Sequence, residues 1–108
     1  MKTILSITLL LIAAVLESGG DALVRSGLHG KLVWPLLIGA VTLFSYGVVV
    51  NLPTWNFGKL LGVYVAFFFL VSQIINYIAF GRLPDWTIVL GGCLILAGAI
   101  VISIRPEV

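Results

Sequence analysis

Two carboxylates and a guanidinium recur at intervals of four residues at the end of an apolar segment. Glu17, Asp21 and Arg25 follow residues 3–16, which carry no formal charge. In a helix, positions four apart fall along one face, with successive members rotated by about 40°. That face is either a structural ladder of ion pairs, in which Arg25 neutralises Asp21, or the wall of an aqueous cavity in which Glu17 is the binding group.

Glu17 is the strongest candidate for a functional group. Counted from Thr3, it lies about 21 Å along a helix axis, past the midplane but still inside a hydrocarbon core about 30 Å thick. A charge at such a depth costs at least ~2.5 kcal/mol on insertion scales and so points to function. Because burial penalises the charged form of a carboxylate, such a group can exchange a proton for a cation. Asp21 lies nearer the boundary, where water alone can solvate it, and is the weaker candidate.

The composition indicates an all-α integral membrane protein. Of the 108 residues, 61% are hydrophobic and only 9% are charged, against roughly a quarter charged in a soluble domain. A soluble fold of this size could not bury so much apolar surface. Uncharged runs approach or exceed the ~20 residues that span a bilayer as helix, and they cover residues 3–16, 32–58, 60–81 and 86–104.

The spacing of these runs predicts four transmembrane helices in a single membrane domain over residues 1–108. All the connecting loops are short, which favours an up-and-down bundle. The glycines and charges of residues 25–31 predict a loop, and Pro35 suits a first helical turn. We expect a multi-pass protein of the cell (inner or plasma) membrane. The predicted helices cover about residues 3–24, 33–52, 57–79 and 86–104.

The basic residues divide equally between the two ends of this arrangement. Three fall on each side, so the positive-inside rule gives no orientation. Either the count is too coarse, or the same chain inserts both ways, which is dual topology. The net charge of +2 is too small and dispersed to indicate nucleic-acid binding. The two groups are Lys2, Lys59 and Arg105 on one side, and Arg25, Lys31 and Arg82 on the other.

Small residues indicate where helices approach closely, since backbone contact replaces the hydrophobic drive that lipid cannot supply. Gly58 and Gly62 form a GxxxG pattern, and with Gly20 they are expected at helix-packing positions. Gly91 and Gly98 are seven residues apart on one helix face, with Leu94 between them.

The remaining polar and aromatic residues of the membrane segments favour packing roles. Ser72 and Asn76 share a helix face and are expected to form hydrogen bonds between helices. The run Phe67-Phe68-Phe69 is expected to face lipid. The sequence contains no phosphate-binding loop, no nucleophile with its base and no metal-ligand cluster, so we expect no enzymatic activity, no metal and no cofactor.

Taken together, these residues resemble the small multidrug resistance proteins and their YnfA-like relatives, four-helix members of the drug/metabolite transporter superfamily. In that family, a membrane-embedded glutamate is followed by a glycine three residues on and a basic residue eight on, and Glu17, Gly20 and Arg25 are similar. Asp85-Trp86 looks YnfA-like. The other similar stretches are Lys31-Leu32-Val33-Trp34-Pro35, Phe80-Gly81-Arg82 and Gly91-x-x-Leu94-x-x-Ala97-Gly98.

The resemblance implies a homodimer, usually of antiparallel subunits, in which two copies of Glu17 share a site for protons or a cationic substrate. Export would then proceed by proton-coupled alternating access, with the proton gradient as the energy source. Gly91, Leu94 and Gly98 would form the dimer contact. With this family in view, the equal Lys/Arg count favours dual topology.

Two positions depart from the family. The drug-exporting branch has a tyrosine three residues before a tryptophan in the third helix, and the corresponding positions look like Leu61 and Tyr64. Tyr64 is therefore expected to line the cavity and orient the substrate, while binding of large aromatic cations is in doubt. Asp21 stands where the family usually has an uncharged residue, and it could change the proton stoichiometry or favour a more highly charged substrate.

The resulting hypothesis is a proton-coupled efflux transporter, an antiporter of small cationic or amphipathic compounds. One alternative is a non-transporting membrane scaffold or accessory subunit whose charges in the first helix pair with a partner. Another is one half of a heterodimeric transporter.

Overall fold

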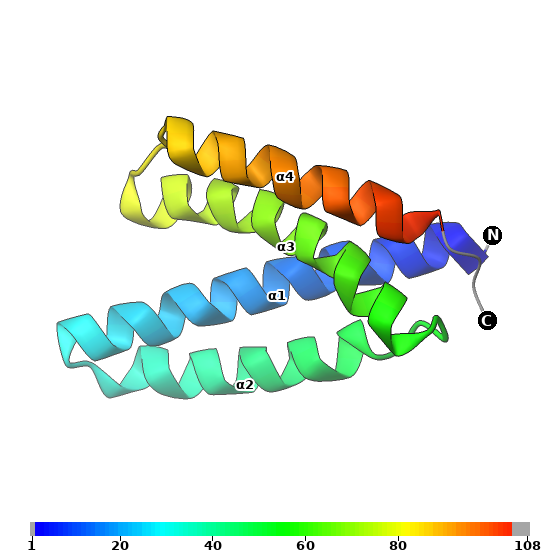
Figure 1. The fold of residues 1–108 in the computed structure, drawn as a ribbon. Coiled ribbons are helices and arrows are strands. Elements are labelled where there is room, and N and C mark those ends of the chain that lie inside the picture. The colour runs from blue at the N-terminus through cyan, green and yellow to red at the C-terminus, as the bar shows by residue number, and fades with distance from the viewer. Residues whose placement is uncertain (1, 105–108) are drawn as a thin grey trace.

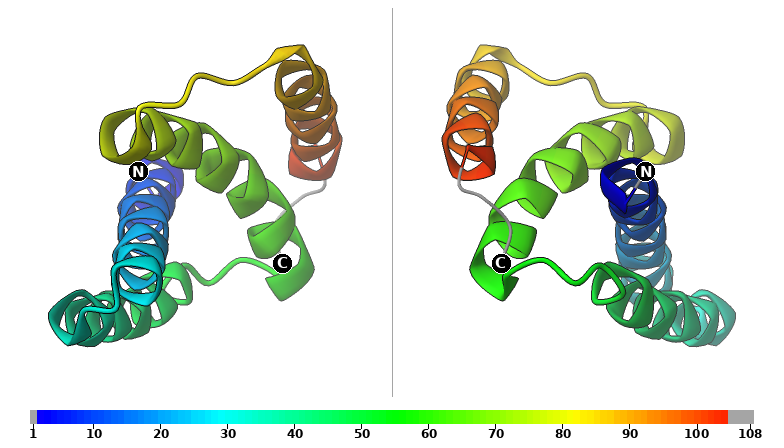
Figure 2. Two further views of the ribbon diagram at one scale, coloured as in Figure 1. Left: turned by 90° about the vertical axis from the view of Figure 1, so that its left-hand side faces the viewer. Right: turned by 90° about the vertical axis from the view of Figure 1, so that its right-hand side faces the viewer.

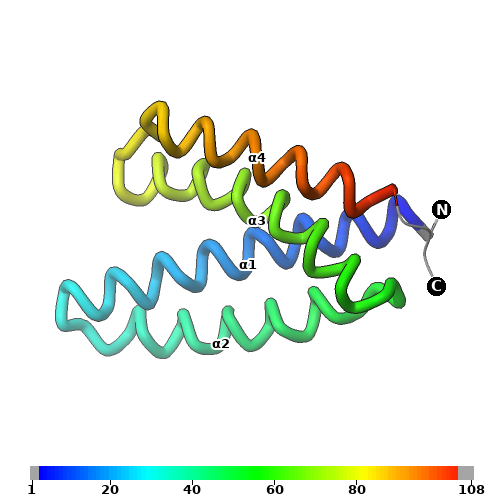
Figure 3. The backbone as a smooth tube through the Cα atoms, viewed as in Figure 1, coloured from blue at the N-terminus to red at the C-terminus, as the bar shows by residue number. Residues whose placement is uncertain are grey.

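Four helices account for most of residues 2–104, the part of the chain that the computed structural model describes. They are α1 (Lys2–Gly30), α2 (Val33–Val50), α3 (Phe57–Phe80) and α4 (Trp86–Ser103). Each runs antiparallel to the next (Figures 1 and 3). All four are long and apolar enough to cross a membrane. The predicted all-α, four-helix membrane fold is confirmed, and α2, α3 and α4 begin and end within two residues of the predicted bounds.

The prediction for the end of the first helix is wrong, because α1 continues to Gly30 through the predicted loop of residues 25–31. Gly27 lies inside the helix and allows α2 to approach: a Cβ there would lie 2.8 Å from Cγ of Leu36. This glycine serves packing rather than helix breaking. A helix of 29 residues is roughly 43 Å long, which places Glu17 near its middle.

Local hydrogen bonds end α1 and begin the later helices. Lys31 adopts a left-handed conformation with φ 54°, and Leu32 N donates to Gly27 O at 3.0 Å, a pattern that closes helix C-termini. Asn56 caps α3 by accepting from two backbone N–H groups. Asp85 caps α4: its carboxylate accepts from the hydroxyl of Thr87 and from a backbone N–H, and both bonds hold the pKa of Asp85 below its usual range.

α1 is the central helix. Its backbone lies close to those of α2 and α3, whereas the α4 backbone lies close to that of α3 alone. Within residues 2–104, α2 meets α3 only through side chains, such as the stacked rings of Tyr46 and Tyr64. Figure 2 shows α4 standing apart from α1 and α2. The bundle is therefore open rather than closed around one axis. Its buried core lies where α1, the end of α2 and the first half of α3 meet, and comprises Leu10, Ala13, Ala14, Val50, Leu60, Val63 and Tyr64.

Glycines permit the close helix contacts. At the crossing of α1 and α2, a Cβ on Gly20 would lie 2.8 Å from Leu43, and one on Gly39 would lie 3.0 Å from the carbonyl oxygen of Gly20. Between α3 and α4, a Cβ on Gly62 would lie 2.6 Å from Ile102. The packing predictions for Gly20 and Gly62 are therefore supported.

The packing prediction for Gly58 is wrong for a single chain. Gly58 lies in the first turn of α3, and among the described residues a Cβ there would meet only the capping oxygen of Asn56, at 3.3 Å. Of the two glycines in the GxxxG pattern, Gly62 therefore packs against α4, and Gly58 lies beside the Asn56 cap of α3.

The glycines predicted for the dimer contact face away from their own chain. A Cβ on Gly91 or Gly98 would meet no atom of the described residues within 4 Å, and Leu94 is 68% exposed. Gly92 faces α3 instead, where its missing side chain makes room for the ring of Phe69. One face of α4 is thus occupied by α3, and the opposite face is open.

Three of the basic residues lie in or beside the connections between helices. The turn at Lys31 and the loop containing Arg82 lie at one end, and the loop of residues 51–56 lies at the other (Figure 1). Lys59 is only 8% exposed, with its Nζ 5.0 Å from the centroid of the Trp55 ring. The side chain of Lys2, and the whole of Arg105, lie outside the described residues.

The crossing of α1 and α2 gives a direct test of the fold. Gly39→Ala should lower the free energy of unfolding in mixed micelles by about 1–3 kcal/mol, because the new methyl group overlaps backbone atoms that cannot move cheaply. The matched control is Gly47→Ala on the same helix, where a Cβ meets nothing within 4 Å of the described residues. The control should be neutral, or stabilising by up to about 1 kcal/mol through helix propensity. Equal losses in the two variants would contradict the packing.

Candidate functional site

A hydrogen bond joins the two residues that the sequence singles out most strongly. The hydroxyl of Tyr64 on α3 donates to Oε1 of Glu17 on α1 over 2.7 Å. Tyr64 is only 4% exposed, and Glu17 is partly buried. Because the partners lie 47 residues apart in the chain, this bond exists only once α1 and α3 have packed together. The pairing of Glu17 with Tyr64 in one site agrees with the sequence prediction.

Aromatic rings surround the carboxylate. The Tyr46 ring from α2 stacks on Tyr64, with 5.7 Å between centroids and 29° between planes, and Phe68 lies tilted 6.1 Å from Tyr64. Together with Leu61 and Val65, these residues line a cavity of about 250 Å³ at Glu17. The site thus takes side chains from three helices.

Tyr46 is the residue that sequence reasoning missed. The sequence shows that Tyr46 is a tyrosine within a membrane segment. Nothing in the spacing along the chain, however, connects it with Tyr64 in the first half of α3. The sequence offers one indication that Tyr46 belongs to a site, namely a polar aromatic residue inside a membrane span. The same residue type is also common where helices simply pack together. The crossing of α2 over α1 brings the Tyr46 ring to Tyr64.

The arrangement is suited to holding either a proton or a cation. A carboxylate supplies the negative charge, and the phenol supplies one donor that fixes an oxygen of that carboxylate. Aromatic faces attract cations, and this attraction is larger where water is excluded. Leu61 leaves an aliphatic wall where the drug-exporting proteins have a second aromatic residue, so the stacking surface for a flat ligand is reduced.

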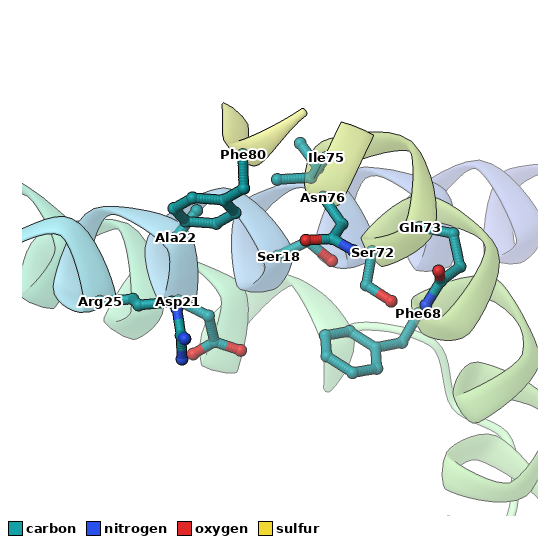
Figure 4. Close-up of a pocket in the computed structure, with 10 residues that line it drawn as sticks. All are labelled: Ser18, Asp21, Ala22, Arg25, Phe68, Ser72, Gln73, Ile75, Asn76 and Phe80. Atoms are coloured by element: carbon teal, nitrogen blue, oxygen red, sulfur yellow. The ribbon is translucent and has the colours of Figure 1, made fainter. Parts of the chain in front are cut away.

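The predicted ladder of ion pairs along α1 does not form. Within residues 2–104, no salt bridge of 4.0 Å or less joins Arg25 to Asp21, and the Arg25 guanidinium instead lies over the Phe80 ring, 5.9 Å from its centroid. Both charged residues line a second cavity of about 250 Å³ between α1 and α3 (Figure 4). Of the two readings of this helix face, the cavity is the one that the structure supports.

Three residues with other expected roles line this second cavity: Phe68, Ser72 and Asn76. Ser72 donates to the carbonyl of Phe69 in its own helix, at 2.8 Å, and with Asn76 it borders the cavity. The expectation that Phe67-Phe68-Phe69 faces lipid is wrong, because all three rings are partly buried and Phe68 lines both cavities. Tight packing of α3 on α1 on one side and α4 on the other covers this run.

The fold and the site define a multi-pass α-helical membrane protein with a carboxylate held among aromatic residues between its helices. The family described as "Uncharacterised BCR, YnfA/UPF0060 family" matches residues 3–107. The chain belongs to this family, so the resemblance to YnfA-like proteins is confirmed.

Similar proteins of known sequence cover almost the full chain. A UPF0060 membrane protein of Clostridium beijerinckii is 35% identical, with 99% of each chain covered. One of Clostridium perfringens is 32% identical, again with 99% of each covered. One of Mycolicibacterium gilvum is 36% identical over 94% of this chain and 96% of that protein. No solved structure matches the chain significantly.

The bond between Tyr64 and Glu17 can be tested without knowledge of a substrate. Tyr64→Phe keeps the stacked ring but removes the donor, and it should lower the free energy of unfolding in micelles by about 1–3 kcal/mol. Tyr77→Phe is the matched control, since Tyr77 is 55% exposed on the same helix, and it should have little effect. In a Glu17→Gln background, the loss caused by Tyr64→Phe should shrink. An unchanged loss in that background would contradict the bond.

Proposed function

We propose that this protein is a proton-coupled exporter of small cationic or amphipathic compounds, in which Glu17 binds protons and substrate alternately. The observation that carries the proposal is the Glu17 carboxylate at mid-helix, bonded to Tyr64 and bordering a cavity with aromatic walls. A carboxylate at that depth is costly to maintain in a bilayer, and such groups mark proton and ion pathways.

Exchange follows from competition for one site. A proton on Glu17 neutralises the carboxylate and weakens its attraction for a cation, whereas a bound cation disfavours protonation. Each occupant therefore displaces the other, and binding from opposite sides of the membrane couples their flows. Tyr64 orients the carboxylate toward the cavity, which makes it a positioning residue as well as part of the cavity wall.

The proposed working unit is an antiparallel homodimer. Three features support it: the open face of α4 with Gly91 and Gly98, the open arrangement of a single chain, and the equal number of Lys and Arg residues at the two ends. Small residues on a lipid-facing helix allow two backbones to approach. Two chains of opposite orientation would bring two Glu17 carboxylates to one central chamber.

Removal of the Glu17 charge tests the transport proposal. In proteoliposomes examined on solid-supported membranes, the wild type should give cation-driven proton currents with at least one member of a panel of amines and quaternary ammonium compounds. Glu17→Gln should lower these currents at least tenfold. Asp85→Asn makes the same chemical change at an exposed helix cap and should leave them intact. Normal currents in Glu17→Gln, or no current in the wild type with any cation, would disprove the proposal.

The α4 contact has a separate test. Gly98→Leu places a bulky side chain on the open face and should reduce the dimer fraction in vesicles at least tenfold, measured by single-molecule photobleaching of labelled subunits. Ala79→Leu adds similar bulk at an exposed position on α3 and should not. An unchanged dimer fraction in Gly98→Leu would show that α4 does not form the contact.

A further inference from the structure

The second cavity, between α1 and α3, carries polar groups that the Glu17 site does not use. Its volume is about 250 Å³, and its polar lining comes from three residues of α1 and three of α3: Ser18, Asp21 and Arg25, and Ser72, Gln73 and Asn76. Figure 4 shows these side chains extending from the two helices into the shared space. The cavity lies in the half of the molecule that leads toward the turn at residue 31.

Two buried atoms of this lining lack a partner. Ser18 is only 4% exposed, and its hydroxyl oxygen makes no hydrogen bond among the described residues. The amide oxygen of Gln73 is likewise buried and without a donor. Unpaired buried polar groups are uncommon because each one costs free energy. The amide oxygen of Gln73 can only accept a hydrogen bond, and the Ser18 hydroxyl can accept as well as donate one. A group that carries N–H donors can therefore satisfy both atoms.

The charge of the cavity also points to a ligand with donors. Asp21 is held in no salt bridge within residues 2–104, since Arg25 lies over the Phe80 ring instead. The Asp21 carboxylate therefore lies in the cavity outside salt-bridge distance of the one guanidinium that shares this lining, that of Arg25. A carboxylate beside two acceptor oxygens matches an ammonium group that carries several N–H bonds.

The two cavities adjoin. Ser18 follows Glu17 in the chain, Asp21 lies one helical turn further on, and Phe68 borders both cavities. A cation that leaves Glu17 toward this end of α1 meets Asp21 next and the guanidinium of Arg25 after it. The order along the helix is thus acid, acid, base, from the middle outward.

We propose that Ser18, Asp21 and Gln73 form a second cation-binding station, selective for ammonium groups with N–H donors over fully alkylated ones. This inference rests on the proposed function of Glu17, because the station lies beside that site. A trimethylated ammonium group offers charge but no N–H bond, so it leaves both buried oxygens unpaired. The Glu17 cavity, with its aromatic walls, makes no such distinction.

The test compares n-butylammonium with butyltrimethylammonium in the same proteoliposomes, because the two probes differ only in their N–H bonds and the three methyl groups. Ser18→Ala removes one oxygen with little change of shape. It should raise the half-saturating concentration of n-butylammonium about three- to tenfold and leave that of the trimethylated probe unchanged. Asp21→Asn should raise the value for n-butylammonium at least tenfold.

Matched controls make these shifts interpretable. Ser45→Ala makes the same change on α2, where the hydroxyl is bonded to the carbonyl of Val41 in its own helix, and it should shift neither probe. Asp85→Asn serves the same purpose for Asp21→Asn. The current carried by the trimethylated probe shows, within each variant, that the protein is folded and active.

The results separate this inference from the proposed function. Selective loss of n-butylammonium in Ser18→Ala, together with a larger loss for n-butylammonium than for the trimethylated probe in Asp21→Asn, supports the second station. Equal shifts of both probes, or no shift of either, overturn the station while the transport proposal stands, provided that Glu17→Gln abolishes both currents. Normal currents in Glu17→Gln overturn the transport proposal and the station together.

Discussion

The hydrogen bond from Tyr64 to Glu17 joins the two longest helices of the protein at the point where a carboxylate is most costly. No water is available in a bilayer core to solvate a charge, so its partners have to come from protein. Tyr64 supplies one partner from α3, and the stacked ring of Tyr46 brings α2 into the same place. The packing of α2 and α3 against α1 therefore also builds the site.

Small residues make this arrangement possible. Gly20 and Gly39 let α1 and α2 cross with their backbones nearly touching, and Gly62 and Gly92 make room between α3 and α4 for the side chains of Ile102 and Phe69. These contacts leave α4 on the outside, attached through α3 alone, with an open face that carries Gly91 and Gly98. The proposed dimer contact rests on this outward face, because small residues on a helix allow a second backbone to approach.

The surroundings of the charged residues on α1 change from the middle of the helix toward its C-terminal end. Glu17 lies among aromatic rings near the middle, Asp21 borders a polar cavity one turn on, and Arg25 lies beyond it over Phe80. The two acids therefore lie in different surroundings, one aromatic and one rich in hydrogen-bond acceptors. Leu61 contributes an aliphatic rather than an aromatic side chain to the cavity at Glu17. Asp21 adds a second carboxylate one helical turn from Glu17. If the protein acts as the proposed exporter, we expect both features to favour small, polar cations over large flat ones.

The sequence alone determined the membrane class and the number of helices, and it singled out Glu17 as a candidate, because hydropathy and the cost of a buried charge act locally and can be read residue by residue. The motifs around Glu17, Trp34-Pro35 and Gly91 to Gly98 also placed the chain in its family. The end of α1 was misread, because glycine breaks a helix in isolation but not where a neighbouring helix packs against it, as at Gly27. Only the tertiary structure decided that Tyr46 joins the site, that Asp21 and Arg25 form no salt bridge and that Gly58 packs against no other helix within residues 2–104. Those outcomes depend on which helices touch, and that is set by contacts between residues far apart in the sequence.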